Sequence, residues 1–204
     1  KVLLIDADPQ GSLTICAGIN EPDRLNYTLA NVLMDIVNEE KIPESKGIIE
    51  HDEGIDVLPA NIELSGIEVS LINVMSRELI MKEFIEKLEN DYDYILIDCM
   101  PSLGIITINA FACADTVLIP VQVSYLSVKG LQQLMKTIAR VKRQINPKLE
   151  IEGILLTMVD YRTNYAKDIS SAIYETYALD IPIFESKVPM SVRAAETSIK
   201  GTSI

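Results

Sequence analysis

The sequence contains few of the residues that build disulfide frameworks and zinc sites. Among its 204 residues there are three cysteines, one histidine and no tryptophan. Cys16, Cys99 and Cys113 are odd in number and show no Cys-x-x-Cys spacing, so we interpret them as buried thiols of a reducing cytoplasm. His51 lies in an acidic stretch with no cysteine nearby, which argues against a metal or Ser-His-Asp role for it.

Long apolar runs and an excess of positive charge are also missing. No apolar stretch reaches the roughly 18 residues that a membrane span needs, and Asp6 and Asp8 interrupt the apolar stretch at the N-terminus. We therefore expect no membrane segment, no signal peptide and a cytoplasmic protein. The net charge of −12 repels nucleic acid and anionic membranes on average, so any contact with DNA would have to be local.

The hydrophobic content of 48% is sufficient for a real core and excludes a disordered chain. Apolar runs predict buried strands at residues 2–5, 55–58, 94–97, 116–121, 151–158 and 183–188. Apolar spacings of three and four predict helices around residues 29–37, 79–88, 127–145 and 164–177. Strands that alternate with helices predict an α/β fold, a doubly wound and mostly parallel sheet with helices on both faces.

We expect residues 1–204 to form a single domain, in which the acidic stretch 39–56 is a solvated connection. Both ends of the chain look cut. Residues 2–5 are already an apolar strand with no initiator methionine before it, and residues 200–204 are of the type found in turns. We therefore expect further residues upstream of Lys1.

Two of the predicted strands end in acids, and ligands of open α/β sheets bind beyond the carboxyl ends of the strands. Asp6 and Asp8 follow the first strand, and Asp98 follows the strand at residues 94–97. An apolar strand closed by an aspartate has the form of a Walker B element, whose acid holds Mg²⁺ or its water shell. Two alternatives remain open: Asp98 accepting backbone N–H bonds, and Asp8-Pro9 opening a turn.

Five segments resemble, in order, the motifs of the ParA-type partition ATPases of the deviant Walker A class. They are residues 2–11 (VLLIDADPQG), 92–104 (YDYILIDCMPSLG), 118–122 (LIPVQ), 156–164 (LTMVDYRTN) and 188–196 (VPMSVRAAE). The second departs from the usual pattern because methionine stands at position 100, where proline is usual. The combination covers nearly the whole chain and is specific, although each segment alone is not.

This resemblance implies a homodimer that forms around ATP and hydrolyses it slowly. Asp98 matches the acid that binds Mg²⁺, Asp8 the acid that orients the attacking water, and Asp6 the strand-end acid beside the metal. Met158, Pro189, Met190 and Ser191 fall where the family contacts the adenine side. For the two methionines, a role as core filler remains an alternative.

The family's first motif, a Gly-rich loop with two lysines, is missing from these 204 residues. That loop cradles phosphates and neutralises their charge, which three carboxylates cannot do. We expect the first βα unit to be absent, the chain as given to be inactive, and the whole protein to carry the loop. Without lysine and Mg²⁺, at least one of the three acids should have a raised pKa.

The resemblance also implies DNA binding without sequence preference through Arg162 and Arg193, a ParB-like DNA-bound partner and association with the nucleoid. Met190 stands where many relatives carry arginine. A separate basic stripe of Lys129, Lys136, Arg140 and Arg143 is interpreted as a solvated helix face. The alternatives are a MinD-like positioning ATPase, which needs a C-terminal membrane helix, and a non-catalytic binding module on the same fold.

Overall fold

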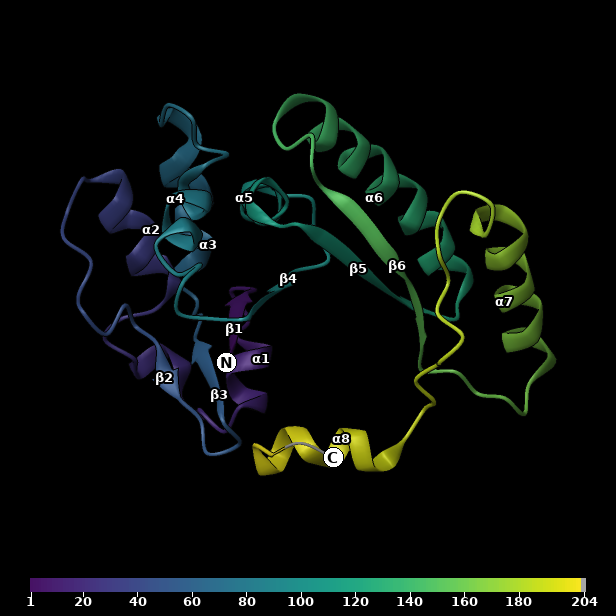
Figure 1. Ribbon diagram of the computed structural model, residues 1–204. Helices are drawn as coiled ribbons and strands as arrows, with labels where there is room; N and C mark the ends of the chain where they lie inside the picture. The colour runs from purple at the N-terminus through teal and green to yellow at the C-terminus, as the bar shows by residue number, and fades with distance from the viewer. Residues whose placement is uncertain (203–204) are drawn as a thin grey trace. The chain divides into compact units, whose positions relative to one another are not determined.

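The computed structural model describes residues 1–202, leaving aside the side chains at positions 195, 198 and 199 (Figure 1). The chain divides into two compact units, Lys1–Cys113 with Ala195–Ile204, and Ala114–Ala194. The predicted C-terminal turn at residues 200–204 lies partly outside the described residues.

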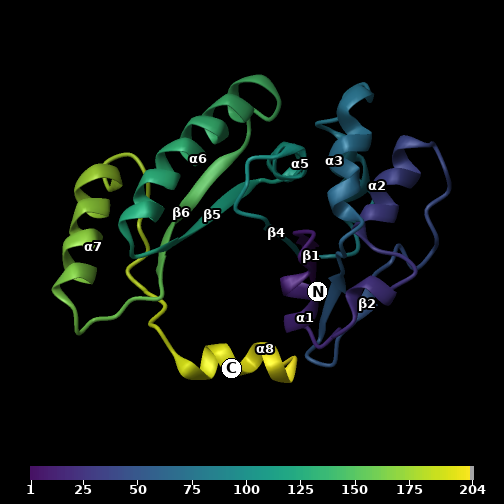
Figure 2. The same ribbon diagram turned by 180° about the vertical axis from the view of Figure 1, so that it is seen from behind.

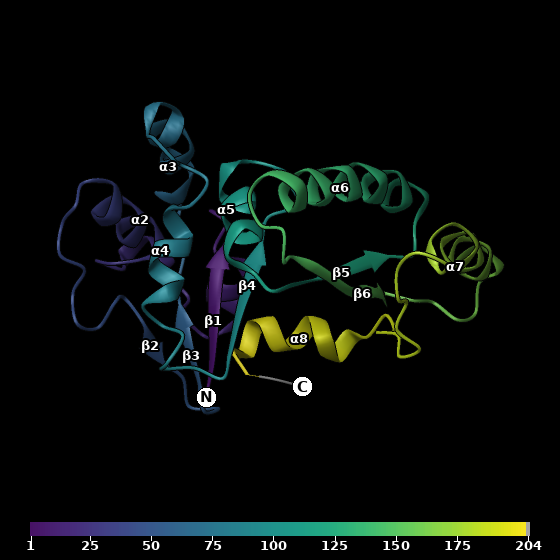
Figure 3. The same ribbon diagram turned by 45° about the horizontal axis from the view of Figure 1, so that its top comes forward.

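The first unit is built on a four-stranded sheet with the order β2-β3-β1-β4. Its strands are β1 (Val2–Ala7), β2 (Ile49–Glu50), β3 (Ile55–Leu58) and β4 (Tyr94–Cys99). β1 pairs in parallel with β3 on one side and with β4 on the other, whereas β2 is antiparallel to β3. β1 and β4 run side by side in Figure 3, and their register places Asp6 beside Asp98.

The helices of the first unit supply most of its core. They are α1 (Ser12–Cys16), η1 (Pro22–Arg24), α2 (Leu29–Val37), α3 (Leu64–Ser70), η2 (Leu71–Asn73), α4 (Ile80–Glu86) and α5 (Ile105–Cys113). α2 begins with a capping box, in which Thr28 N donates to Asn31 Oδ1 at 2.8 Å. Its buried face packs against β1, α3 and α4, so the apolar stripe seen in the sequence is the one that faces the core.

The second unit has a parallel pair of strands, β5 (Thr116–Gln122) and β6 (Glu150–Thr157). Between them runs α6 (Tyr125–Gln144), which lies along this pair in both Figure 1 and Figure 2. α7 (Asn164–Tyr177) follows β6, and its cap is Thr163, whose Oγ1 accepts a hydrogen bond from Ala166 N at 3.2 Å. α8 (Val192–Lys200) begins in the second unit and ends in the first.

The α/β class, the predominantly parallel pairing and the four predicted helices are confirmed, with the strands divided between two sheets. The strand predicted at residues 183–188 is wrong. This segment runs beside β6, with Phe184 N donating to Ile154 O at 3.0 Å and Val188 N to Leu156 O at 2.9 Å, but among the described residues it forms only isolated bridges. Ile183 pairs with Ile154 of β6, and Pro189 pairs with Val159, two residues beyond the end of β6. The segment has one residue more than the partner chain between these bridges, so a regular ladder does not form.

Burial differs from the sequence-based expectation at several positions, of which three lie in the sheet of the first unit. Tyr94 and Leu96 are exposed, because exposure alternates along β4 and both side chains lie on its exposed face. Asp56, predicted to lie in a solvated connection, is a buried residue of β3 that accepts hydrogen bonds from Lys1 Nζ and Tyr92 Oη at 2.6 Å each. Burial alone would raise the pKa of Asp56, but these two donors outweigh it and lower the pKa.

The cysteines are not uniformly buried. Cys16 is exposed, whereas Cys99 and Cys113 are half-buried. Burial, followed by repulsion from Asp98, raises the pKa of the Cys99 thiol to about 12, so this thiol stays protonated. Among the helices of residues 1–202, none combines the length and apolarity needed to cross a membrane.

Candidate functional site

The carboxylate of Asp6 lies at the carboxyl end of β1 and is fully buried. Its Oδ2 accepts two hydrogen bonds from Thr14, one from the backbone N at 2.8 Å and one from Oγ1 at 2.7 Å. Its Oδ1 accepts a third from Asp8 N at 3.1 Å. A buried charge is tolerated when its lone pairs are satisfied in this way, so Asp6 ties the end of β1 to the start of α1.

A tight turn brings Thr14 to Asp6. Gly11 N donates to Asp8 O at 2.9 Å, and Gly11 has a φ of 63°, a left-handed conformation in which a side chain is strained. A Cβ at this position would also lie 3.1 Å from Ala60 O. The hydroxyl of Thr14 has a second role, because it accepts a hydrogen bond from Ala60 N at 3.0 Å.

Asp8 projects from the same turn. It is half-buried, and its Oδ1 accepts a hydrogen bond from Gln10 N at 2.9 Å. The turn-opening role considered for Asp8-Pro9 is therefore present. It engages one carboxylate oxygen of Asp8.

Asp98 lies near the carboxyl end of β4 and is the register partner of Asp6 on the adjacent strand β1. Part of its side chain is open to solvent, but the surrounding protein removes some of its water, and this desolvation raises its pKa. Repulsion from Asp6 and then from Asp8 raises the pKa further. The structure thus brings the three predicted acids of the first unit together, and the expectation that one of them has a raised pKa is confirmed.

Uncompensated negative charge of this kind fits a cation. In the described residues, no group of three or more histidine, cysteine, aspartate or glutamate side chains is arranged so that it could hold a metal ion by itself. Mg²⁺ does not require one, since it is usually held by one or two carboxylates together with waters and substrate phosphates. The residues present therefore fit Mg²⁺ bound at Asp98.

The loop after Asp98 is anchored by Thr107, a buried residue of α5. Its Oγ1 donates to Ser102 O at 2.8 Å. This bond joins the segment at residues 100–104 to the first turns of α5. It therefore fixes the path of the chain where β4 ends.

In the second unit, the structure brings together the segments predicted to contact the adenine side. Met190 N donates to Val159 O at 3.3 Å, and Val159 pairs with Pro189. Met158 and Met190 are 49% and 60% exposed, so neither is core filler. Met158 has a φ of 52°, an uncommon conformation for a residue with a side chain, and such strain is concentrated at functional sites. Ser191, the next residue after Met190, is exposed.

Arg162 and Arg193 are both exposed in the second unit. The guanidinium of Arg162 forms a two-pronged ion pair with Asp160, with Nε–Oδ1 and Nη2–Oδ2 distances of 2.9 and 3.1 Å. These bonds lower the pKa of Asp160. Part of the positive charge of Arg162 is therefore balanced within its own loop.

Comparisons with known proteins agree with this arrangement. The AAA domain family matches residues 1–151. The sporulation initiation inhibitor protein Soj of Bacillus subtilis is 39% identical over the whole chain, which spans 78% of that protein. The chromosome partitioning protein ParA of Myxococcus xanthus is 40% identical, again over the whole chain, which spans 70% of it. The chain belongs to the family of ParA-type partitioning ATPases.

A solved structure supports the fold. Cobyrinic acid a,c-diamide synthase of Mycobacterium smegmatis, solved with a bound ATP analogue and magnesium, is 35% identical with a TM-score of 0.85. The match covers 98% of this chain and 78% of that one. The ParA-type α/β fold with helices on both sides of the sheet is thereby confirmed.

The site residue that the sequence motifs did not indicate is Thr14. It lies three residues beyond the first ParA-type segment, in a helix of five residues that is too short to show periodicity. The only sequence feature that could have indicated Thr14 is the position of its hydroxyl one short turn after Asp6, the aspartate at the end of the strand.

We predict that Thr14→Val lowers the free energy of unfolding by about 1–3 kcal/mol, because it removes a donor to the buried Asp6 carboxylate and an acceptor for Ala60 N. Thr14→Ser keeps the hydroxyl and is the matched control. Urea unfolding followed by circular dichroism measures both. Equal losses for the valine and serine variants would show that the hydroxyl contributes nothing.

The raised pKa of Asp98 predicts a pH dependence of stability. The folded protein holds this proton to a higher pH than the unfolded chain, so rising pH through that interval favours unfolding. Asp98→Asn should therefore increase the free energy of unfolding at pH 7. Its advantage should shrink as the pH falls toward the ordinary aspartate pKa of about 3.9.

Urea unfolding between pH 4 and pH 7.5 gives this difference, and the exposed Asp52 provides the control variant Asp52→Asn. A benefit of Asp98→Asn that does not change with pH would contradict the assignment.

Proposed function

We propose that the whole protein is a ParA-like ATPase that dimerises on ATP, binds DNA without sequence preference and hydrolyses ATP slowly to drive DNA segregation. The observation that carries this proposal is the meeting of Asp6, Asp8 and Asp98 at the carboxyl ends of two adjacent parallel strands. Membership of the ParA-type family and the nucleotide-bound relative support it.

The three acids take different roles in this proposal. Asp98 holds Mg²⁺ directly or through water, and the bound ion supplies charge neutralisation for the phosphate oxygens. Asp8 orients the attacking water, since its carboxylate is half-buried and the turn is held through only one of its oxygens, Oδ1. Asp6, with both oxygens already bonded by the protein, holds the Asp8 turn beside the metal.

Phosphoryl transfer depends on positioning and on electrostatic stabilisation, so a fixed carboxylate beside a water is a sufficient catalytic part. The three acids repel phosphate, and binding of a triphosphate therefore needs a cationic cradle as well. We propose that a Gly-rich loop of the whole protein provides it. The adenine side is assigned to Met158, Pro189, Met190 and Ser191, two segments that backbone pairing holds together.

Arg162 and Arg193 are proposed to contact DNA phosphates, and a ParB-like DNA-bound protein is proposed as the partner. Their exposure supports this role. The ion pair of Arg162 with Asp160 and the overall charge of −12 predict that binding is weak. Through DNA, the dimer would associate with the nucleoid.

The ATPase proposal is tested with the whole protein and its Asp8→Asn variant. We expect kcat to fall about 100-fold or more, because removing a positioned catalytic carboxylate removes an effect of this size. Nucleotide affinity should change only a few-fold. Asp52→Asn removes an exposed acid of the same unit and should leave kcat unchanged. Wild-type turnover by Asp8→Asn would reject the role given to Asp8.

DNA binding is tested by changing Arg162 and Arg193 together to alanine. With ATP present, we expect binding to duplex DNA to weaken and the dependence of log K on log salt to flatten by about 0.9 for each phosphate that the variant no longer neutralises. The pair Arg24→Ala and Lys41→Ala removes the same charge at exposed positions of the other unit. If both double variants weaken binding equally, only net charge matters and the two arginines do not contact the DNA.

A further inference from the structure

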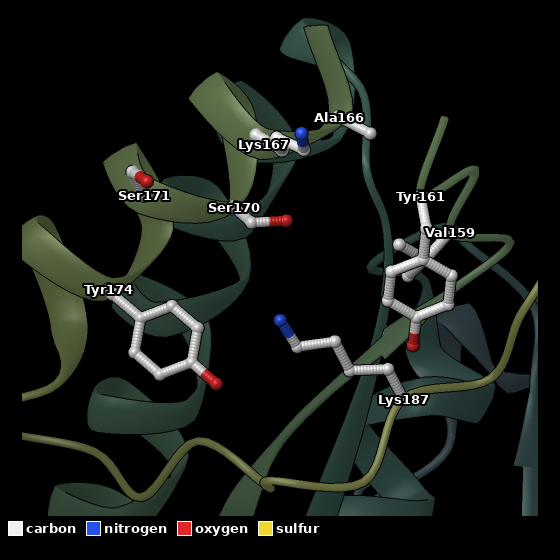
Figure 4. A pocket seen from close by; sticks show the side chains of 8 residues that line it. All are labelled: Val159, Tyr161, Ala166, Lys167, Ser170, Ser171, Tyr174 and Lys187. Atoms are coloured by element: carbon white, nitrogen blue, oxygen red, sulfur yellow. The ribbon is translucent and has the colours of Figure 1, made fainter. Parts of the chain in front are cut away.

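A hollow on the second unit is not used by the proposed ATPase. It has a volume of about 250 Å³ and lies between α7 and the segment that precedes α8 (Figure 4). α7 contributes Lys167, Ser170, Ser171 and Tyr174 to its wall, and Lys187 enters from the opposite segment. Tyr161, Val159 and Ala166 complete it.

The ammonium group of Lys187 points into this hollow (Figure 4). Lys187 is half-buried, and its Nζ lies 5.5 Å from the centre of the Tyr174 ring. In the described part of the chain, neither Lys187 nor Lys167 forms an ion pair. Contact with the ring face offsets only part of the free energy that the Lys187 ammonium loses when it gives up water. A half-buried ammonium group without a carboxylate partner therefore favours binding of an anionic ligand.

The other polar groups of the wall are hydroxyls. Ser170 is 8% exposed and its hydroxyl points into the hollow, and Tyr174 lines the wall from the next turn of α7 (Figure 4). Among the described residues, no acid lines the hollow. The Lys187 ammonium and the Ser170 hydroxyl, with the exposed Lys167 on the same wall, form a set of donors suited to the oxygens of one oxyanion.

Size restricts the ligand further. Pockets for whole cofactors or drug-sized ligands occupy about 300–1,000 Å³, so this hollow holds a smaller group than a nucleotide. Ser170 is almost buried, so a terminal phosphoryl group with one organic substituent suits this position better than a phosphodiester with two. We propose that this hollow binds the phosphoryl group of a small phosphate monoester, with the tyrosine rings and Val159 beside the organic part.

The test is a titration of the 204-residue protein with phenyl phosphate, followed by ¹H–¹⁵N NMR. We expect saturable shifts at the amides of Ala166, Ser170 and Lys187. Affinity should rise as the pH passes about 6, where a phosphate monoester gains its second charge. Phenyl sulfate, which stays singly charged, should bind more weakly, and phenol should not bind.

The informative variant is Lys187→Gln, which should weaken phenyl phosphate binding about tenfold or more, since it removes a charged hydrogen-bond donor. Lys148→Gln removes an exposed lysine of the same unit and should leave affinity unchanged. Thermal unfolding of both variants shows that they remain folded.

Four results would overturn the proposal. No shift at the hollow with millimolar phenyl phosphate excludes a monoester site. Equal binding of phenol shows that the ring alone is recognised. Equal weakening by Lys148→Gln shows only general attraction to positive charge. If duplex DNA displaces phenyl phosphate from the wild-type protein, and this displacement is lost in Lys187→Gln, the hollow binds DNA instead. Because no arm uses ATP, these outcomes are independent of the ATPase proposal.

Discussion

The fully buried carboxylate of Asp6 is the interaction on which the first unit's site depends. Its three donors come from Thr14 and from the backbone of Asp8, so one charge fixes the end of β1, the following turn and the start of α1. If Asp6 were unpaired, the cost of burying its charge would be several kcal/mol. The turn that carries Asp8 therefore follows from satisfying Asp6, and the position of Asp8 is set by stability as much as by chemistry.

Asp98 shows the opposite balance. It gains no compensating partner from the described residues, and desolvation together with Asp6 and Asp8 penalises its charged form. An acid at position 98 therefore does not stabilise the fold of these residues. Its presence beside two other acids agrees with the proposed metal site, because the repulsion between the acids would become attraction for a bound cation.

The sequence predicted most of this arrangement wherever a signal was continuous along the chain. β1 and β4 are apolar runs that end in acids, and parallel pairing then places Asp6 beside Asp98. Thr14 was not predicted, because its role depends on its side-chain hydrogen bond to Asp6, eight residues earlier, and on the left-handed conformation of Gly11. Neither feature appears in the spacing of apolar residues. The segment at residues 183–188 was predicted as a strand from its apolar residues, although its pairing with β6 is interrupted.

For Met158 and Met190, the sequence did not decide between a position in the core and a position on the surface. Met158 and Met190 are apolar residues that end or follow apolar segments, so the core and the surface were equally compatible with the sequence. Backbone pairing of Val159 with Pro189 decides between them, since it directs the chain so that both neighbours remain exposed. A left-handed Met158 is strained, and an exposed apolar side chain gains nothing from solvent. The exposure of both side chains agrees with the proposed contact with the flat face of a base, whereas packing within the unit does not account for it.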